Sequence, residues 1–208
     1  MGSAPGGEAA LRPRRRRLFF ALWPDAACRE RLENALQATP AGIVASAGGV
    51  PSAASVASGA QAGRRVPPAD WHVTLCFLGA VPDSLLMALQ AGAARLHAPA
   101  FTLHFDRVRY WKQARVLALL GDCPPAAAAL SAALRALGRE LGLAPEDKPL
   151  RPHITLVRGL RASAWHGRRE SALELVLPAT RFDLAESIEP AVAPAARYRS
   201  LAAWPLRG

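Results

Sequence analysis

The chain has 208 residues, of which 51% are hydrophobic and 20% are charged, and it carries a formal net charge of +10 at pH 7. This length suits one medium-sized domain, or two tightly joined lobes, with a core that needs no disulfide staples. No apolar run approaches the length of a bilayer span and the N-terminus has no signal-peptide pattern, so we exclude a membrane protein and expect a cytoplasmic one.

The first residues of the chain are basic and of low complexity. Residues 1–17 contribute a net charge of +4, which leaves about +6 on the rest of the chain. We expect residues 1–16 to form a disordered basic arm that could touch a phosphate backbone without reading bases. A basic body favours a polyanionic partner, above all nucleic acid, although a compositional bias toward Arg and Ala would produce the same charge.

Apolar patterns predict strands and helices along residues 17–206, which we expect to form one bilobal domain. In chain order the expected elements are a strand at 18–23, a helix at 25–38 capped by Asp25, a strand at 71–79, a helix capped by Asp83, a hairpin of strands at 101–108 and 114–120, a helix at 124–142, a strand at 149–160 and closing strands at 171–187 and 196–205. Residues 41–63 carry no charge and have little to bury, so we expect an inserted flexible loop there.

Two further residue types are assigned to structural roles. The three cysteines, Cys28, Cys76 and Cys123, have no metal-ligand spacing, and we expect the first two to be buried as small hydrophobes. We expect His104 and His166 at the surface.

Each of the strands at 71–79 and 149–160 contains a His-x-Thr triplet in an apolar, β-branched run. We name His72-Val73-Thr74 the first motif and His153-Ile154-Thr155 the second motif. With five His and five Thr in the chain, two such triplets arise by chance with a probability of about 0.5%. One triplet alone is most simply a surface histidine beside a β-favouring threonine, but two in matching strands favour a functional site.

The order strand, helix, motif strand occurs twice, and the loop at 41–63 accounts for the greater length of the first copy. Two such copies related by a pseudo-dyad would bring the two motifs face to face across a cleft. Strand side chains alternate, so the His and Thr of each motif should share a face, while Val73, Leu75 and Phe77 should point into the core. By strict alternation Arg158, five residues after His153, faces away from the motif, and it can serve there only if the strand twists or ends early.

Two facing imidazoles suit acid–base chemistry near neutral pH, because an unperturbed histidine has a pKa of about 6.5. One can accept a proton from a nucleophile while the other donates a proton to a leaving group, as in-line displacement at phosphorus requires. The two threonine hydroxyls suit the non-bridging phosphoryl oxygens, and Arg158 could add charge-assisted contacts. Neither motif contains a carboxylate and each offers a single metal ligand, so we expect no metal and no cofactor.

On these residues the chain resembles the 2H phosphoesterase superfamily, and within it the RNA 2′,3′-cyclic phosphodiesterases, also called 2′-5′ RNA ligase-like proteins. The likeness spans most of residues 17–206, including the opening strand from Arg17 to Leu22, the first motif and its flanks, and the segment from Arg151 to Arg158 around the second motif. Residues 41–63 and Asp70 depart from the family pattern.

The resemblance implies a bilobal, pseudo-symmetric α+β fold in which two antiparallel sheets face each other across a central cleft, with helices outside. It implies metal-independent hydrolysis of RNA 2′,3′-cyclic phosphate ends, including ends derived from tRNA, to 2′-phosphomonoesters by a monomer. The implied site residues are His72 as proton donor, His153 as proton acceptor, Thr74 and Thr155 around the phosphate, and Arg158, Arg151 and Phe20 as substrate contacts.

Other interpretations remain open. The same fold could serve as a non-catalytic RNA- or nucleotide-binding module, or as an enzyme that acts on ADP-ribose cyclic phosphate, cleaves 2′-5′ oligonucleotides or ligates RNA. The motifs could also be incidental in a basic structural protein. The intact His and Thr of both motifs favour catalysis, and the basic surface favours an RNA end over a free nucleotide.

Overall fold

The computed structural model describes residues 14–38, 63–162, 173–188 and 196–207. Residues 1–13 of the expected arm, residues 41–62 of the expected loop and His166 lie outside these ranges. Within them, no helix is long and apolar enough to span a membrane.

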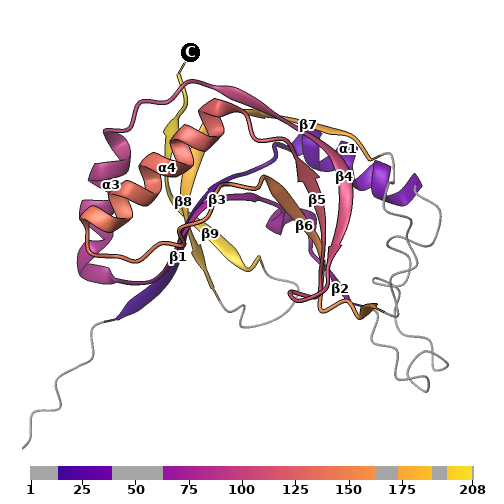
Figure 1. The fold of residues 1–208 in the computed structure, drawn as a ribbon, viewed down its shortest axis with the longest axis horizontal. Coiled ribbons are helices and arrows are strands. Elements are labelled where there is room, and N and C mark those ends of the chain that lie inside the picture. The colour runs from indigo at the N-terminus through magenta and orange to yellow at the C-terminus, as the bar shows by residue number, and fades with distance from the viewer. Residues whose placement is uncertain (1–13, 39–62, 163–172, 189–195, 208) are drawn as a thin grey trace, which may run out of the picture.

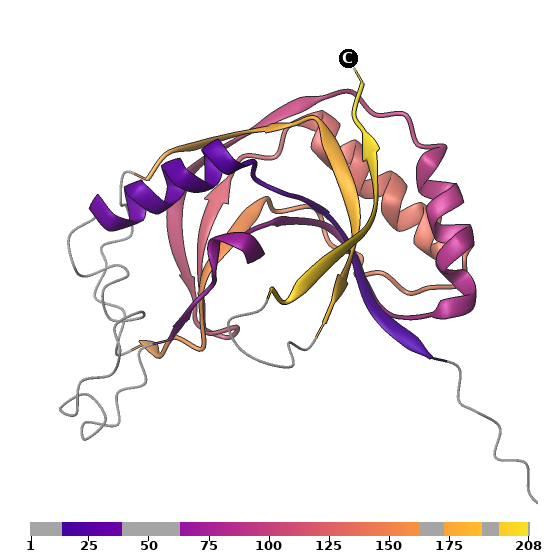
Figure 2. The same cartoon turned by 180° about the vertical axis from the view of Figure 1, so that it is seen from behind.

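Two antiparallel sheets form the frame of the molecule, with helices on their outer sides (Figures 1 and 2). The first sheet has the strand order β3 (Val73–Pro82), β1 (Arg15–Leu22), β8 (Arg181–Ser187), β9 (Tyr198–Pro205). The second has the order β2 (Arg64–Arg65), β6 (His153–Arg158), β5 (Val116–Gly121), β4 (Phe101–Trp111), β7 (Leu175–Ala179). The predicted α+β fold with two antiparallel sheets is therefore confirmed.

The two sheets repeat one arrangement. In each, the strand that bears a motif pairs antiparallel with the strand that precedes it in the repeat: β3 with β1, and β6 with β5. The next neighbours are β8 and then β9 in one sheet, and β4 and then β7 in the other. Leaving β2 aside, the order β3-β1-β8-β9 matches β6-β5-β4-β7, which is the pseudo-dyad that the sequence predicted.

The helices are α1 (Ala26–Ala38), α3 (Leu86–Ala94) and α4 (Pro125–Glu140), with short 3-10 turns η2 (Pro68–Asp70) and η3 (Asp83–Leu85). Each repeat helix packs on the sheet of the other repeat, since α1 contacts β7 and α4 contacts β3. Consequently α1 and the α3–α4 pair lie at opposite ends of the molecule (Figure 1). Leu32 of α1 and Leu130 and Leu134 of α4 are buried, and one continuous apolar cluster joins both sheets to the helices.

Local signals predicted the start of α1 but not that of α3. The Asp25 carboxylate accepts a hydrogen bond from the Cys28 backbone N–H at 2.7 Å, so Asp25 caps α1 as expected. Asp83 instead begins the 3-10 turn η3, makes no side-chain cap, and forms an ion pair with Arg16 at 2.8 Å. The prediction that Asp83 caps a helix is therefore wrong.

Other boundaries also differ from the sequence prediction. Strand β1 begins at Arg15, so Arg15 and Arg16 belong to the sheet and not to a disordered arm. The single strand expected at 171–187 is two strands, β7 and β8, which belong to different sheets. Cys28 and Cys76 are buried and His104 is exposed, as predicted.

A β-bulge follows each motif at the same place. Ala21 and Phe20 of β1 pair with Thr74 and Cys76, so Leu75 is an extra residue in β3. In the second sheet, Ala118 and Leu117 of β5 pair with Thr155 and Val157, so Leu156 is the extra residue in β6. The extra residue and its successor are both buried in each strand, which reverses the alternation of faces beyond the bulge.

Each bulged carbonyl finds a partner outside its own strand ladder. The buried Ser131 hydroxyl of α4 donates to the Leu75 carbonyl at 2.6 Å, and the Val66 backbone N–H donates to the Leu156 carbonyl at 2.8 Å. A buried carbonyl without a partner costs free energy, so these two bonds help to hold the bulges in place.

We predict that Ser131→Ala lowers the free energy of unfolding by about 1–3 kcal/mol, because the Leu75 carbonyl loses its donor in a buried position. Urea denaturation of the purified variant measures this change. The exposed Ser84 supplies the matched control, since Ser84→Ala removes a hydroxyl in contact with solvent. Equal stability of the two variants would contradict a role for Ser131 in supporting the bulge.

Candidate active site

The two motif histidines are held in the same way by the backbone. His72 lies one residue before β3 and His153 is the first residue of β6. The Nδ1 atom of His72 is 2.7 Å from the Asp70 carbonyl oxygen, and Nδ1 of His153 is 2.8 Å from the Arg151 carbonyl oxygen. A carbonyl only accepts hydrogen bonds, so Nδ1 carries the proton in both rings and Nε2 is left to exchange protons with a ligand.

The first motif borders a cavity of about 620 Å³ between strand ends of the first sheet and β6. Its walls include His72, Thr74 and Phe77 on one side and Arg158 on the other. A second hollow of about 490 Å³ shares Thr74 and Phe77 with the first and is bordered by His153. Thr155 is half-buried on β6, two residues from His153. The two motifs therefore meet around Thr74, from opposite sheets.

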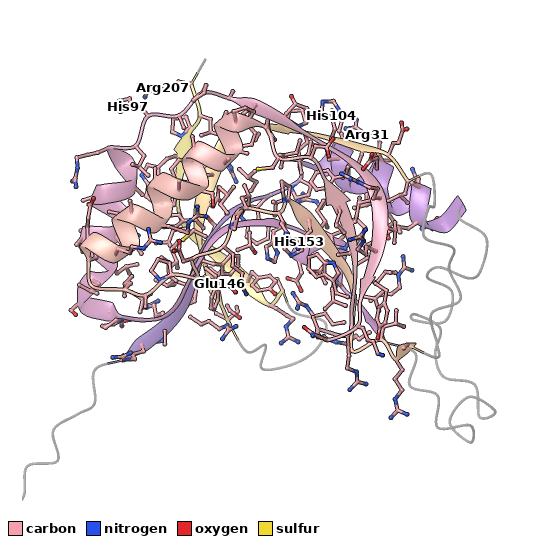
Figure 3. All side chains as sticks on the ribbon, in the orientation of Figure 1. Arg31, His97, His104, Glu146, His153 and Arg207 are labelled. Carbon is pink, nitrogen blue, oxygen red and sulfur yellow. The ribbon has the colours of Figure 1, made fainter. Side chains whose placement is uncertain are left out.

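Figure 3 shows the contrast between His153 and two other histidines. His153 lies in the interior of the molecule between the sheets, whereas His97 and His104 lie at its outer edge. The positive charges of His153 and Arg158 both act on the His72 ring, which places these three groups within electrostatic reach of one another.

The bulge after each motif decides which later side chains face the cavity. Arg158 follows the extra residue Leu156, so it returns to the His153 face in spite of its odd spacing and lines the cavity. In β3 the same reversal brings Phe77 to the cavity. The prediction that Phe77 points into the core is therefore wrong, because strict alternation ignores the bulge.

Of the remaining two residues expected to contact substrate, one borders the site and the other lies in the core. Arg151 is exposed and borders the hollow beside His153, so it stays a candidate. Phe20 is fully buried and packs against Phe182 and Trp204 in the core, so the prediction that it contacts substrate is wrong. Its neighbour Phe19 has the opposite parity in β1 and lines the cavity instead.

An aromatic enclosure surrounds His72. The centroid of its ring lies 5.1 Å from that of Phe19, 5.2 Å from that of Trp23 and 4.7 Å from that of Tyr198. These rings could not be identified from the sequence, because residues 18–22 of β1 are apolar on both faces and Tyr198 comes from the far end of the chain. His153 has one such neighbour, Trp111, at 4.7 Å.

Burial changes the acidity of both histidines. Desolvation, opposed by the bond to the Asp70 carbonyl and assisted by the charges of Arg158 and His153, lowers the pKa of His72 to about 4. Desolvation and then the charge of Arg158 lower the pKa of His153, against the bond to the Arg151 carbonyl. In the absence of an anion, both imidazoles are therefore neutral at pH 7.

Asp70 connects the first motif to the last strand. Its carbonyl holds His72, and its carboxylate oxygen Oδ1 accepts the Arg197 backbone N–H at 2.9 Å. The next residue, Tyr198, packs edge-on against the His72 ring. Asp70 is 1% exposed, so this link is shielded from water and fixes the aromatic enclosure relative to the imidazole.

The side chain of Arg158 makes no hydrogen bond or ion pair with another of the residues that the structure describes, although its charge acts on both imidazoles. The same part of the chain contains no group of three or more His, Cys, Asp or Glu placed to hold a metal ion. The groups gathered at the cavity are thus imidazoles, hydroxyls and a guanidinium.

Comparisons with known proteins agree with this arrangement. Residues 52–118, which contain the first motif, match the family model described as LigT-like phosphoesterase. The chain is 37% identical over 99 residues to the RNA 2′,3′-cyclic phosphodiesterase of Escherichia coli K12, a match that covers 47% of this chain and only 56% of that relative.

Solved structures extend the likeness over nearly the whole chain. A crystal structure of a phosphoesterase superposes with a TM-score of 0.73 and 30% identity, over 95% of this chain and 100% of the other. The crystal structure of E. coli LigT complexed with 3′-AMP superposes with a TM-score of 0.70 and 28% identity, over 92% of this chain and 98% of the other.

We predict that NMR titration of the histidine ring protons in the free protein gives His72 a pKa of about 4 and His153 a pKa below its usual value. Inorganic phosphate should raise both, because a bound anion favours the imidazolium form. Resonances are assigned with the variants His72→Asn and His153→Asn. An ordinary pKa of about 6.5 for His72 in the free protein would contradict the burial described here.

A second prediction follows for stability. Unfolded His72 binds a proton near its ordinary pKa, whereas the folded form binds it only near pH 4, so between these values the unfolded state holds more protons. The free energy of unfolding should have its full value above about pH 6.5. As the pH drops below this value, protonation of His72 in the unfolded state should lower it by at most about 3 kcal/mol. Urea unfolding at pH 7 and pH 5 should show a smaller loss for His72→Gln than for the parent; an equal loss would refute the prediction.

Proposed function

This chain belongs to the LigT-like phosphoesterase family, and we propose that it hydrolyses 2′,3′-cyclic phosphate ends of RNA to 2′-phosphomonoesters by paired-histidine acid–base catalysis without a metal ion. The observation that carries the proposal is the pair of imidazoles, each with Nδ1 bonded to a backbone carbonyl and Nε2 left for the substrate. His72 lines one cavity with Thr74 and Arg158, and His153 borders the adjoining hollow, which shares Thr74.

In the proposed reaction His153 is the proton acceptor. Its Nε2 takes a proton from water as the water oxygen attacks phosphorus, and the P–O3′ bond breaks on the opposite side. His72 is the proton donor, and its Nε2 gives a proton to the departing O3′ oxygen. The product keeps the phosphate on O2′, and the two histidines then return to their starting protonation states by exchange with solvent.

The acidities support this division of roles. Binding of the anionic phosphodiester raises the pKa of both imidazoles and makes protonation of one of them favourable near neutral pH. His72 is the ring enclosed by aromatic side chains and has the more strongly depressed pKa, so its imidazolium is the better donor. His153, with one aromatic neighbour, is the better acceptor.

The phosphate oxygens need partners while charge builds up on them. We assign the hydroxyls of Thr74 and Thr155 and the guanidinium of Arg158 to this task, with Arg151 beside His153 as an additional contact. Preorganised donors around a phosphoryl group are a large source of rate enhancement, and a guanidinium can bind two oxygens at once. The five-membered cyclic ester is strained, so the reaction needs less stabilisation from these donors.

We also propose that the enzyme works as a cytoplasmic monomer on RNA ends that include tRNA fragments. Support for the monomer comes from the fact that one chain carries both motifs. Support for a reducing compartment comes from Cys28, Cys76 and Cys123, which are all free thiols.

The decisive test is hydrolysis of adenosine 2′,3′-cyclic phosphate in the presence of EDTA, with the product isomer identified by ³¹P NMR. We expect release of adenosine 2′-phosphate, and a loss of about 10²–10⁴ in kcat for His72→Ala and for His153→Ala. The exposed His104 is the control, and His104→Ala should retain parental activity.

Absence of turnover on this nucleotide and on a short RNA with a cyclic end would refute the proposal and favour a binding module of the same fold. Turnover that disappears with EDTA, or that survives both motif substitutions, would refute the paired-histidine mechanism.

A further inference from the structure

The catalytic cavity contains more positive charge than a cyclic phosphate requires. Five arginines line it: Arg15, Arg16, Arg17, Arg158 and Arg197. Its carboxylate, Glu186, is already shared by Arg16 at 3.3 Å and Arg199 at 2.7 Å, and Arg16 also pairs with Asp83. A 2′,3′-cyclic phosphodiester brings a single negative charge, and Arg158 lies beside the motifs to meet it.

Three arginines of the cavity are left over. Within the described residues, the guanidiniums of Arg15, Arg17 and Arg197 have no carboxylate partner; that of Arg15 donates a 3.4 Å hydrogen bond to the Ala80 carbonyl. Like charges gathered without counter-charges repel one another, so this group gains stability when it binds an anion.

Two of these arginines, Arg15 and Arg17, lie at a defined distance from the motifs along β1, and Arg197 directly precedes β9. Ala21 pairs with Thr74, Phe19 pairs with Phe77, and Arg17 pairs with Ala80. Alternate residues of a strand share a face and are about 6.7 Å apart, so the Arg17 position lies about 13 Å along β1 from the level of Thr74. Arg15 lies one further step away on the same face.

Aromatic rings fill the space between the two charged zones. Phe19, Phe77 and Tyr198 form one apolar cluster on this face, and the guanidinium of Arg17 lies 4.6 Å from the centroid of the Phe77 ring. The cavity thus presents a phosphate site, a patch of rings and a group of guanidiniums in that order. A nucleotide with a phosphate at each end presents phosphate, sugar and base, and phosphate in the same order.

We propose that Arg15, Arg17 and Arg197 form a second phosphate subsite, which binds the phosphate on the 5′ side of the nucleotide that carries the cyclic ester. This inference rests on the proposed function for the identity of the first phosphate. Two kinds of ligand carry a phosphate at this position: RNA has an internucleotide phosphate there, and a free nucleotide has a terminal 5′-phosphate.

Three substrates test the subsite: adenosine 2′,3′-cyclic phosphate, its 5′-phosphorylated form, and the dinucleotide ApA with a 2′,3′-cyclic end. At low ionic strength we expect a higher kcat/KM for at least one substrate with a second phosphate. In Arg17→Gln the ratio of that kcat/KM to the value for adenosine 2′,3′-cyclic phosphate should fall about tenfold, because hydrogen bonds between a guanidinium and a phosphate are stronger than those between neutral groups.

Arg95→Gln is the matched control, because Arg95 is exposed at the end of α3, away from the cavity. Its substrate ratio should equal that of the parent. A gain for both second-phosphate substrates supports a site for any 5′-phosphate, and a gain for the dinucleotide alone supports an internucleotide phosphate. No preference in the parent, or the same ratio in Arg17→Gln and the parent, would overturn the proposal.

A binding measurement separates this inference from the proposed function. Calorimetry should show that adenosine 2′,5′-bisphosphate binds more tightly than adenosine 2′-phosphate, and that Arg17→Gln removes most of the difference. This holds whether or not the protein turns over a cyclic ester. Equal affinities for the two ligands would overturn the subsite, whereas unequal affinities without turnover would remove the proposed function and leave the subsite in place.

Discussion

The site depends on the alternation of side chains in its β-strands. One extra residue directly after the threonine of each motif reverses this alternation. Leu75 and Leu156 each interrupt the alternation directly after a motif threonine. As a result the side chains five residues after the two histidines, Phe77 and Arg158, face the cavity. The repeat thus supplies an aromatic ring from one sheet and a guanidinium from the other, at equivalent positions.

Burial of two imidazoles near Arg158 disfavours their protonation, and the proposed reaction can use this effect. Burial and the charge of Arg158 favour neutral rings in the free protein. A phosphate reverses this preference, because it neutralises the guanidinium and attracts the proton. We infer that protonation and phosphate binding are coupled, and that the aromatic enclosure makes the coupling stronger at His72, the proposed proton donor.

Local sequence patterns predicted some features of the fold and of the site but not others. The strands that bear the motifs, the strand–helix–strand repeat and the cap at Asp25 follow from local patterns and were predicted correctly. The wrong face for Phe77 came from a bulge, which leaves no mark in an apolar run. The wrong assignment of Phe20 arose because residues 18–22 of β1 are apolar on both faces, so parity could not separate Phe20 in the core from Phe19 at the cavity.

The central claim is that both motifs act on one phosphate, and a crystal structure of the protein with bound inorganic phosphate tests it most directly. We predict a single phosphate ion within hydrogen-bonding distance of Nε2 of both His72 and His153, with Thr74, Thr155 and Arg158 contacting its oxygens. A phosphate bound to one motif alone, with the other imidazole out of reach of it, would contradict the account.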